Sequence, residues 1–179
     1  MPHEVRTLTF GPDSLKGAEY LEINPLGRVP AIRDGDVTMV ESGAIVEYLL
    51  ECHGNGRLAP GAGTPARPAY LQWFHFGEAT MLPPLSDLVQ HSFLRPEAER
   101  IAAMVPDAQR RAGEVLGVLE RHLAGRAYVA GEFSAADIMV GYACAVAKLI
   151  GLLGGGYQAA HAYLDRLEAR PAFQKAFAA

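Results

Sequence analysis

The sequence predicts a small α/β unit followed by a larger all-helical unit. Short β-rich runs and turn signals occupy the first third of the chain, whereas stretches with helical periodicity occupy the rest. Between them, glycine and proline cluster in residues 51–68, which indicates a connection without regular structure. We therefore expect a first domain at residues 1–54, a linker at 55–65 and an all-helical domain at 66–179.

The strongest signal in the first domain is Asp34-Gly35, which lies between two short β-rich runs and predicts a hairpin. Alternating apolar residues near the amino end predict a further strand, and the segment after the hairpin carries apolar residues on one side of a helix. The expected elements are a strand at 4–10, one or two helical turns at 17–23, strands at Val29–Arg33 and Val37–Val40, and a helix at 42–53.

The second domain is expected to be a bundle of helices. Pro83-Pro84 must kink or end the first helix, and Pro106 must bend the second or mark a break, because proline removes a main-chain donor. The segment 134–153 is apolar nearly all round, which is typical of a central helix. The expected helices begin near Pro68 and then occupy 97–124, 134–153, 157–169 and 171–178.

Composition argues against several classes of function. The net charge is -4 and the chain has no long basic stripe, so nucleic acid is not an expected partner. Two distant cysteines, Cys52 and Cys144, indicate a reduced compartment, and we expect a cytoplasmic protein. No spacing typical of metal ligands occurs, so no metal is expected. The amino end lacks a signal-peptide pattern and Lys148 interrupts the longest apolar segment, so no membrane span is expected.

Val29-Pro30 is the first candidate for a binding role. Proline cannot donate to a strand ladder, and X-Pro is the common site of cis peptide bonds. A cis turn here would leave the Val29 N–H and C=O facing outward, where they could pair with a bound peptide as an added strand. A plain loop proline is the alternative, and the residues alone favour it because most X-Pro bonds are trans.

Glu41-Ser42 is the second candidate, at the start of the helix predicted over 42–53. Ser42 is well placed to be the N-cap of a helix at 43–52, and this structural role is the simpler interpretation. A helix N-terminus also attracts a carboxylate, and Glu41 could hold an ammonium group. The pair is therefore complementary to the zwitterionic end of an amino acid, and together with Val29 it suits an extended peptide.

The stretch "NPLGRVPAIRDG…VTMVESGAIVEYL" resembles the second half of the thioredoxin-like domain of glutathione S-transferases. Further on, "GRAYVAGEFSAADIMVGY" resembles the sixth helix of that family with its lead-in, and "EARPAFQKAF" resembles its last helix. The resemblance implies an incomplete thioredoxin-like domain followed by the all-helical C-terminal domain of a glutathione transferase.

The resemblance also implies roles for the candidate residues. It implies that the bond before Pro30 is cis and that the Val29 main chain pairs with the cysteinyl part of glutathione. It implies that Glu41 and Ser42 hold the γ-glutamyl group. Glutathione is then the expected co-substrate.

In the helical domain, Ser134 and Asp137 match the capping box that nucleates the family's sixth helix. The resemblance implies a homodimer along helices matching 43–52, 66–92 and 97–124, and a small electrophile between the domains, against the helix of Trp73, Phe74 and Phe76. Such aromatic residues are more often core than substrate wall. His75 and His91 could act as acid-base groups, but a structural role is the simpler interpretation.

The part of the family pattern that precedes residues 3–10 has no counterpart in this sequence. It contains the tyrosine, serine or cysteine that favours the glutathione thiolate, which is the nucleophile. Thr7 and Thr9 fall in the family's second strand, so neither takes this role. Without the first strand, residues 4–10 lack a neighbour. They could slide into its place or pair with another chain; alternatively the natural protein starts earlier, which the well-kept site residues favour.

Two functions follow from these residues. The first is an enzyme that conjugates glutathione to small electrophiles if the segment bearing the thiolate-stabilising residue is supplied. The second is a non-catalytic scaffold of the same fold that holds glutathione or a protein partner, an interpretation that the unmatched catalytic position favours. A conjugation assay and calorimetry with glutathione discriminate between them.

Overall fold

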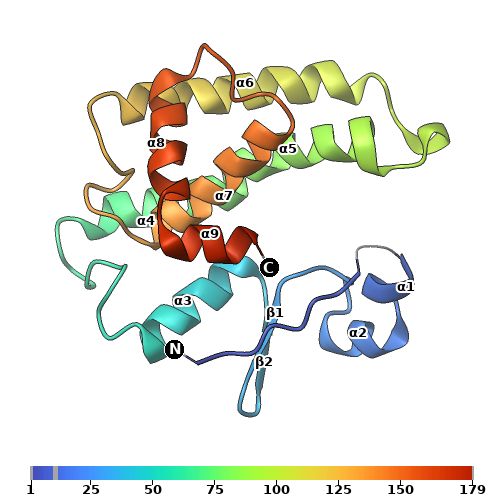
Figure 1. The fold of residues 1–179 in the computed structure, drawn as a ribbon, viewed down its shortest axis with the longest axis horizontal. Helices are drawn as coiled ribbons and strands as arrows, with labels where there is room; N and C mark the ends of the chain where they lie inside the picture. The colour runs from blue at the N-terminus through green and yellow to red at the C-terminus, as the bar shows by residue number, and fades with distance from the viewer. Residues whose placement is uncertain (1, 10–11, 179) are drawn as a thin grey trace. The chain divides into compact units, whose positions relative to one another are not determined.

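The computed structural model describes residues 2–9 and 12–178 and divides into two compact units, Met1–Arg57 and Leu58–Ala179. The first unit contains the strands and three of the helical elements, and the second is helical throughout the part that is described (Figure 1). The predicted fold class, an α/β unit followed by a helical one, is therefore confirmed.

The first unit is built around an antiparallel hairpin. β1 (Ala31–Asp34) pairs with β2 (Val37–Val40) in a register that sets Ala31 opposite Val40. Gly35 begins the turn with a φ of +57°, a left-handed value that glycine adopts without steric cost. The predicted hairpin is confirmed, although its first strand begins later than we predicted.

Three helices complete the first unit, and they are α1 (Pro12–Leu15), α2 (Ala18–Ile23) and α3 (Ser42–His53). α3 packs against both strands and buries Ile45, which is 5% exposed. The helices predicted at 17–23 and 42–53 are therefore confirmed. Pro12–Leu15, where we expected a turn, forms one helical turn.

The strand predicted at 4–10 is wrong for the described residues 4–9, whereas residue 10 lies outside the described part. Within the described residues the sheet has two strands, so this segment has not moved into it. Val5 is 64% exposed, and Arg6 forms an exposed ion pair with Glu19 at 2.8 Å. Alternation alone predicted the strand, but a strand also needs a neighbour to accept and donate its ladder hydrogen bonds.

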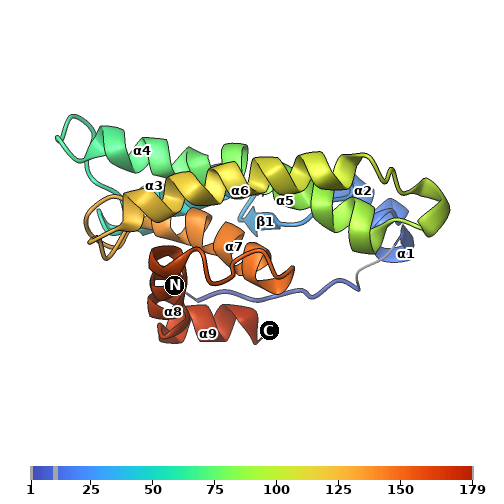
Figure 2. The same cartoon turned by 90° about the horizontal axis from the view of Figure 1, so that it is seen from above.

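The second unit is a helical bundle whose core lies around α7 (Figures 1 and 2). α4 and η1 pack against α7, α5 packs against α6, and α8 contacts both α6 and α7. The elements are α4 (Arg67–His75), the π-helical η1 (Phe76–Met81), α5 (Leu82–Val89), the π-helical η2 (Gln90–Leu94), the 3₁₀ turn η3 (Glu97–Glu99), α6 (Met104–Leu123), α7 (Ala135–Leu149), α8 (Gln158–Glu168) and α9 (Pro171–Phe177).

The prolines explain where this unit differs from the sequence prediction. The first helix neither ends nor restarts freely at Pro83-Pro84, because η1 widens the hydrogen-bond spacing and the prolines then fall in the first turn of α5. The helix predicted at 97–124 begins only at Met104, which places Pro106 in its first turn, where proline is tolerated. The helix predicted at 134–153 is likewise shorter, since α7 ends at Leu149.

A close helix approach organises the core around α7. A Cβ atom on Gly77 of η1 would lie 2.6 Å from the carbonyl carbon of Met139, a main-chain atom of α7. Only glycine permits this contact, because a main-chain atom cannot move aside as a flexible side chain can. No helix in the described part of the chain is long and apolar enough to cross a membrane.

Candidate functional site

The chain around Val29 presents an unpaired main-chain edge. The Val29-Pro30 peptide bond is cis, and the Val29 side chain is 57% exposed. The β1 ladder starts two residues later, at Ala31. Within the described residues, neither the N–H nor the C=O of Val29 forms a hydrogen bond. Both groups can therefore accept a partner from outside the chain.

Glu41 and Ser42 form the start of α3, but not as we predicted. Glu41 is the N-cap residue, because its C=O accepts the first helical hydrogen bond, from the Ile45 N–H at 2.9 Å. The prediction that Ser42 is the N-cap is wrong: Ser42 is the first helical residue. Glu41 holds φ at 73° and ψ at 109°, a strained conformation for a residue with a side chain, and such strain concentrates at functional sites.

The hairpin brings these two segments to one end of the sheet. Ala31 follows Val29-Pro30 directly, and Glu41 follows Val40 directly. Because Ala31 and Val40 are paired, with Cα atoms about 5 Å apart in such a pair, both segments leave the hairpin at its open end. The main-chain edge at Val29 and the amino end of α3 are therefore neighbours in space. The first-turn N–H groups of α3 favour an anion there.

Two side chains that sequence reasoning missed support this edge. The Tyr20 hydroxyl and the Asn24 amide both donate hydrogen bonds to the C=O of Arg28, at 2.7 and 2.6 Å. Tyr20 lies on α2, and Asn24 follows that helix. The only signal for Asn24 is its place in the Asn-Pro-x-Gly loop, whereas no pattern indicates Tyr20.

A polar cluster ties the turn end of β1 to the last turns of α3. The Tyr48 hydroxyl donates to the Asp34 carboxylate at 3.1 Å, and His53 Nε2 lies 2.7 Å from the same oxygen. The hydrogen bond with His53, followed by that from Tyr48, holds the pKa of Asp34 below its ordinary value. The same carboxylate raises the pKa of Tyr48.

Ser134 and Asp137 form a buried capping box at the start of α7. The Asp137 carboxylate accepts from the Ser134 N–H at 2.8 Å, and the Ser134 side chain faces the main chain of Asp137 in return. Asp137 also accepts from the Val129 N–H at 3.0 Å and the Tyr163 hydroxyl at 3.0 Å. Burial raises the pKa of Asp137, and these hydrogen bonds oppose that shift.

The aromatic and histidine candidates of the helical unit have mainly structural surroundings. Trp73 and Phe74 are 4% and 1% exposed, so both belong to the core. His91 is 8% exposed and its Nδ1 accepts from the Ile101 N–H at 3.1 Å, which is a structural role. Within the described part, no three His, Cys, Asp or Glu side chains are grouped so that they could hold a metal ion.

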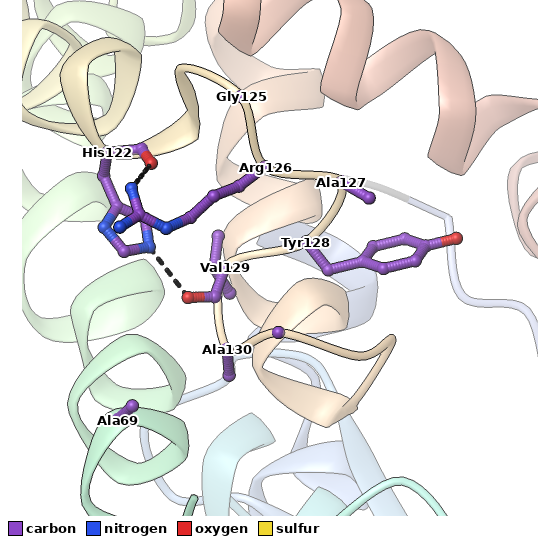
Figure 3. A pocket seen from close by; sticks show the side chains of 9 residues that line it. Ala69, His122, Gly125, Arg126, Ala127, Tyr128, Val129 and Ala130 are labelled. Carbon is purple, nitrogen blue, oxygen red and sulfur yellow. Dashed lines mark hydrogen bonds between the residues drawn. The ribbon is translucent and has the colours of Figure 1, made fainter.

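A cavity of about 500 Å³ lies in the helical unit, beside the loop that connects α6 to α7 (Figure 3). Figure 3 shows the Arg126 side chain reaching back to the end of α6, where it donates to the His122 C=O at 2.5 Å. His122 Nε2 in turn lies 2.8 Å from the Val129 C=O. No residue of the candidate site in the first unit lines this cavity, and these contacts serve to fix the loop.

Known protein families match both units. The model of the glutathione S-transferase N-terminal domain matches residues 1–57, and the model of the C-terminal domain matches residues 83–171. The glutathione S-transferase-like protein tpcF of Aspergillus fumigatus is 31% identical, over 99% of this chain and 85% of the relative. The chain belongs to the glutathione S-transferase family. Glutathione S-transferase 3 of Zea mays is similar as well, at 32% identity over 92% of this chain and 77% of the relative.

Solved glutathione transferases share the fold. The glutathione transferase URE2P6 of Phanerochaete chrysosporium, solved in complex with oxidized glutathione, matches with a TM-score of 0.85 and 29% identity, over 99% of this chain and 84% of that chain. A sphingomonad glutathione S-transferase complexed with glutathione matches with a TM-score of 0.78 and 27% identity, over 92% and 80% of the two chains. The family and the fold predicted from the sequence are confirmed.

Proposed function

We propose that this glutathione S-transferase family member binds glutathione at the open end of the hairpin, through Val29, Pro30, Glu41 and Ser42. The observation that carries the proposal is the β1–β2 register, which makes the Val29 edge and the amino end of α3 neighbours. Solved relatives with this fold hold glutathione, which supports the same ligand here.

Each part of glutathione has a complementary group in this arrangement. The N–H and C=O of its cysteinyl residue pair with those of Val29, as one strand pairs with another. The α-carboxylate of its γ-glutamyl residue lies at the first turn of α3, where N–H groups and the helix dipole favour an anion. Its ammonium group lies near the exposed carboxylate of Glu41.

We further propose that the bound thiol reacts with small electrophiles. The thiol proton passes to solvent or to a base, and the thiolate sulfur forms a bond to the electrophilic carbon while the leaving group departs with its electron pair. A free thiol with a pKa of about 8.5 is only a few per cent ionised at neutral pH, so the rate depends on a group that lowers this pKa. No residue among 1–10 matches the family's thiolate-stabilising position.

This mismatch favours the second candidate, a glutathione-binding scaffold without conjugating activity. The two differ in one result, the formation of a thioether from glutathione and an aryl halide, followed by absorbance. Thioether formation above the uncatalysed rate supports the transferase. Binding without turnover supports the scaffold.

Calorimetry with reduced glutathione tests the binding proposal itself. We expect the wild-type chain to bind and Ser42→Ala to bind more weakly, because the variant removes a polar group at the amino end of α3. Ser92→Ala is the matched control, since Ser92 is also half-buried but belongs to the helical unit. Equal heats for wild type and Ser42→Ala would remove Ser42 from the site, and no heat with the wild type would overturn the proposal.

The family resemblance also supports a homodimer in the cytoplasm, with helices from 43–52, 66–92 and 97–124 at the interface. Light scattering of the purified chain tests the assembly. A mass of twice the 19.2 kDa chain is the expected result, and a mass of one chain would contradict the dimer.

A further inference from the structure

The carbonyl group that precedes Val29 is held by two buried donors. The Arg28 C=O accepts from the Tyr20 hydroxyl at 2.7 Å and from the Asn24 amide at 2.6 Å. Tyr20 is 8% exposed and Asn24 is 5% exposed, so water competes little for either bond. The two donors satisfy both lone pairs of this one oxygen.

The rest of the loop at 24–28 is fixed as well. Asn24 Oδ1 accepts from the Leu26 N–H at 3.0 Å, and the Asn24 C=O accepts from the Gly27 N–H at 2.7 Å. Lys16 donates to the Leu26 C=O at 2.6 Å. Gly27 has a φ of +57°, and a Cβ there would lie 2.4 Å from the C=O of Leu15. The loop therefore packs closely against the end of α1 and has little freedom to change its path.

The geometry of the peptide group carries the anchoring of Arg28 over to Val29. The Arg28 C=O and the Val29 N–H belong to one planar group, and in a trans peptide they point in opposite directions. The only cis bond among the described residues is Val29-Pro30, so the Arg28-Val29 bond is trans. With its C=O directed at Tyr20 and Asn24, this group must direct the Val29 N–H away from those side chains, which agrees with the lack of a partner for this N–H within the described residues.

We propose that Tyr20 and Asn24 are positioning residues of the glutathione site, which act by orienting the peptide group shared by Arg28 and Val29. The proposal rests on the function proposed above. Neither side chain needs to touch glutathione. Instead, they hold the Val29 N–H in its binding direction before the ligand arrives, so binding does not have to include the cost of ordering this segment.

Calorimetry with reduced glutathione on the full chain tests the proposal. Tyr20→Phe removes only the hydroxyl, and Asn24→Asp replaces the donor to Arg28 by an acceptor. We expect the dissociation constant to rise about 2- to 10-fold in Tyr20→Phe, the range that corresponds to one hydrogen bond, and to rise further in Asn24→Asp. Tyr163→Phe is the matched control, because it removes a buried hydroxyl bond of the helical unit. It should lower thermal stability and leave the dissociation constant unchanged.

A readout without glutathione separates positioning from general stability. The main-chain ¹⁵N shift of Val29 responds to hydrogen bonds that the preceding carbonyl accepts, so it should change in Tyr20→Phe and Asn24→Asp and stay constant in Tyr163→Phe. If the wild type binds and either folded variant binds equally well with an unchanged Val29 shift, the positioning role is refuted while the proposed function stands. If the wild type does not bind, the proposed function fails, and the positioning role fails with it.

Discussion

Replacing Asp137 by alanine is expected to destabilise the helical unit by about 3 kcal/mol. The change leaves three buried donors without their acceptor, the N–H groups of Ser134 and Val129 and the hydroxyl of Tyr163. A buried donor without a partner costs about 1–3 kcal/mol. We take the lower end, about 1 kcal/mol each, because removal of the carboxylate also relieves its desolvation, which raises the pKa of Asp137.

Trp73 gives a direct assay for this prediction. It is the single tryptophan of the chain and lies in the core of the helical unit, so its fluorescence follows that unit during urea unfolding. The Asp137→Ala midpoint should fall with an unchanged slope, and the melting temperature should drop by roughly 10 °C. Asp165→Ala is the control, because this exposed carboxylate lies 3.6 Å from His161 and should contribute at most about 0.5 kcal/mol. An Asp137→Ala midpoint equal to that of the control would refute the reasoning.

Three other predictions concern contacts outside the capping box. Because the pKa of Asp34 is lowered, its stabilising effect is present above the ordinary Asp value of 3.8 and is lost as the pH falls through the lowered value; His53→Gln should weaken this acid dependence in thermal melts. Gly77→Ala should cost about 1–3 kcal/mol through its clash with the α7 main chain, whereas Gly154→Ala, with open space around it, should cost far less in the same unfolding assay. Glu120→Ala removes the carboxylate that accepts from two N–H groups of the first turn of α8 and should cost about 1 kcal/mol in urea unfolding, whereas an unchanged midpoint would contradict this capping role.

Local signals in the sequence were enough for the hairpin and for most helices. Asp34-Gly35 predicts the turn because one residue there must adopt a left-handed conformation, and Gly35 does so. The end of the hairpin where Val29 and Glu41 meet follows from this turn, since the register of a two-residue hairpin is set by the turn itself.

Features that depend on tertiary surroundings were not predictable. Glu41 adopts a positive φ that its residue type disfavours, so the sequence placed the start of α3 one residue too late. The segment 4–9 has the alternation of a strand, but alternation does not provide a neighbouring strand. Tyr20 acts through a main-chain carbonyl, and such a partner leaves no trace in the identity of the residue that carries it.

The most direct test of the site is an NMR titration of the ¹⁵N-labelled chain with reduced glutathione, followed at the amide signals of Val29 and Ser42. The proposed geometry predicts that both signals shift together along one binding curve, because one ligand contacts the hairpin edge and the amino end of α3. Shifts confined to other residues, or two unrelated curves for these two amides, would contradict it.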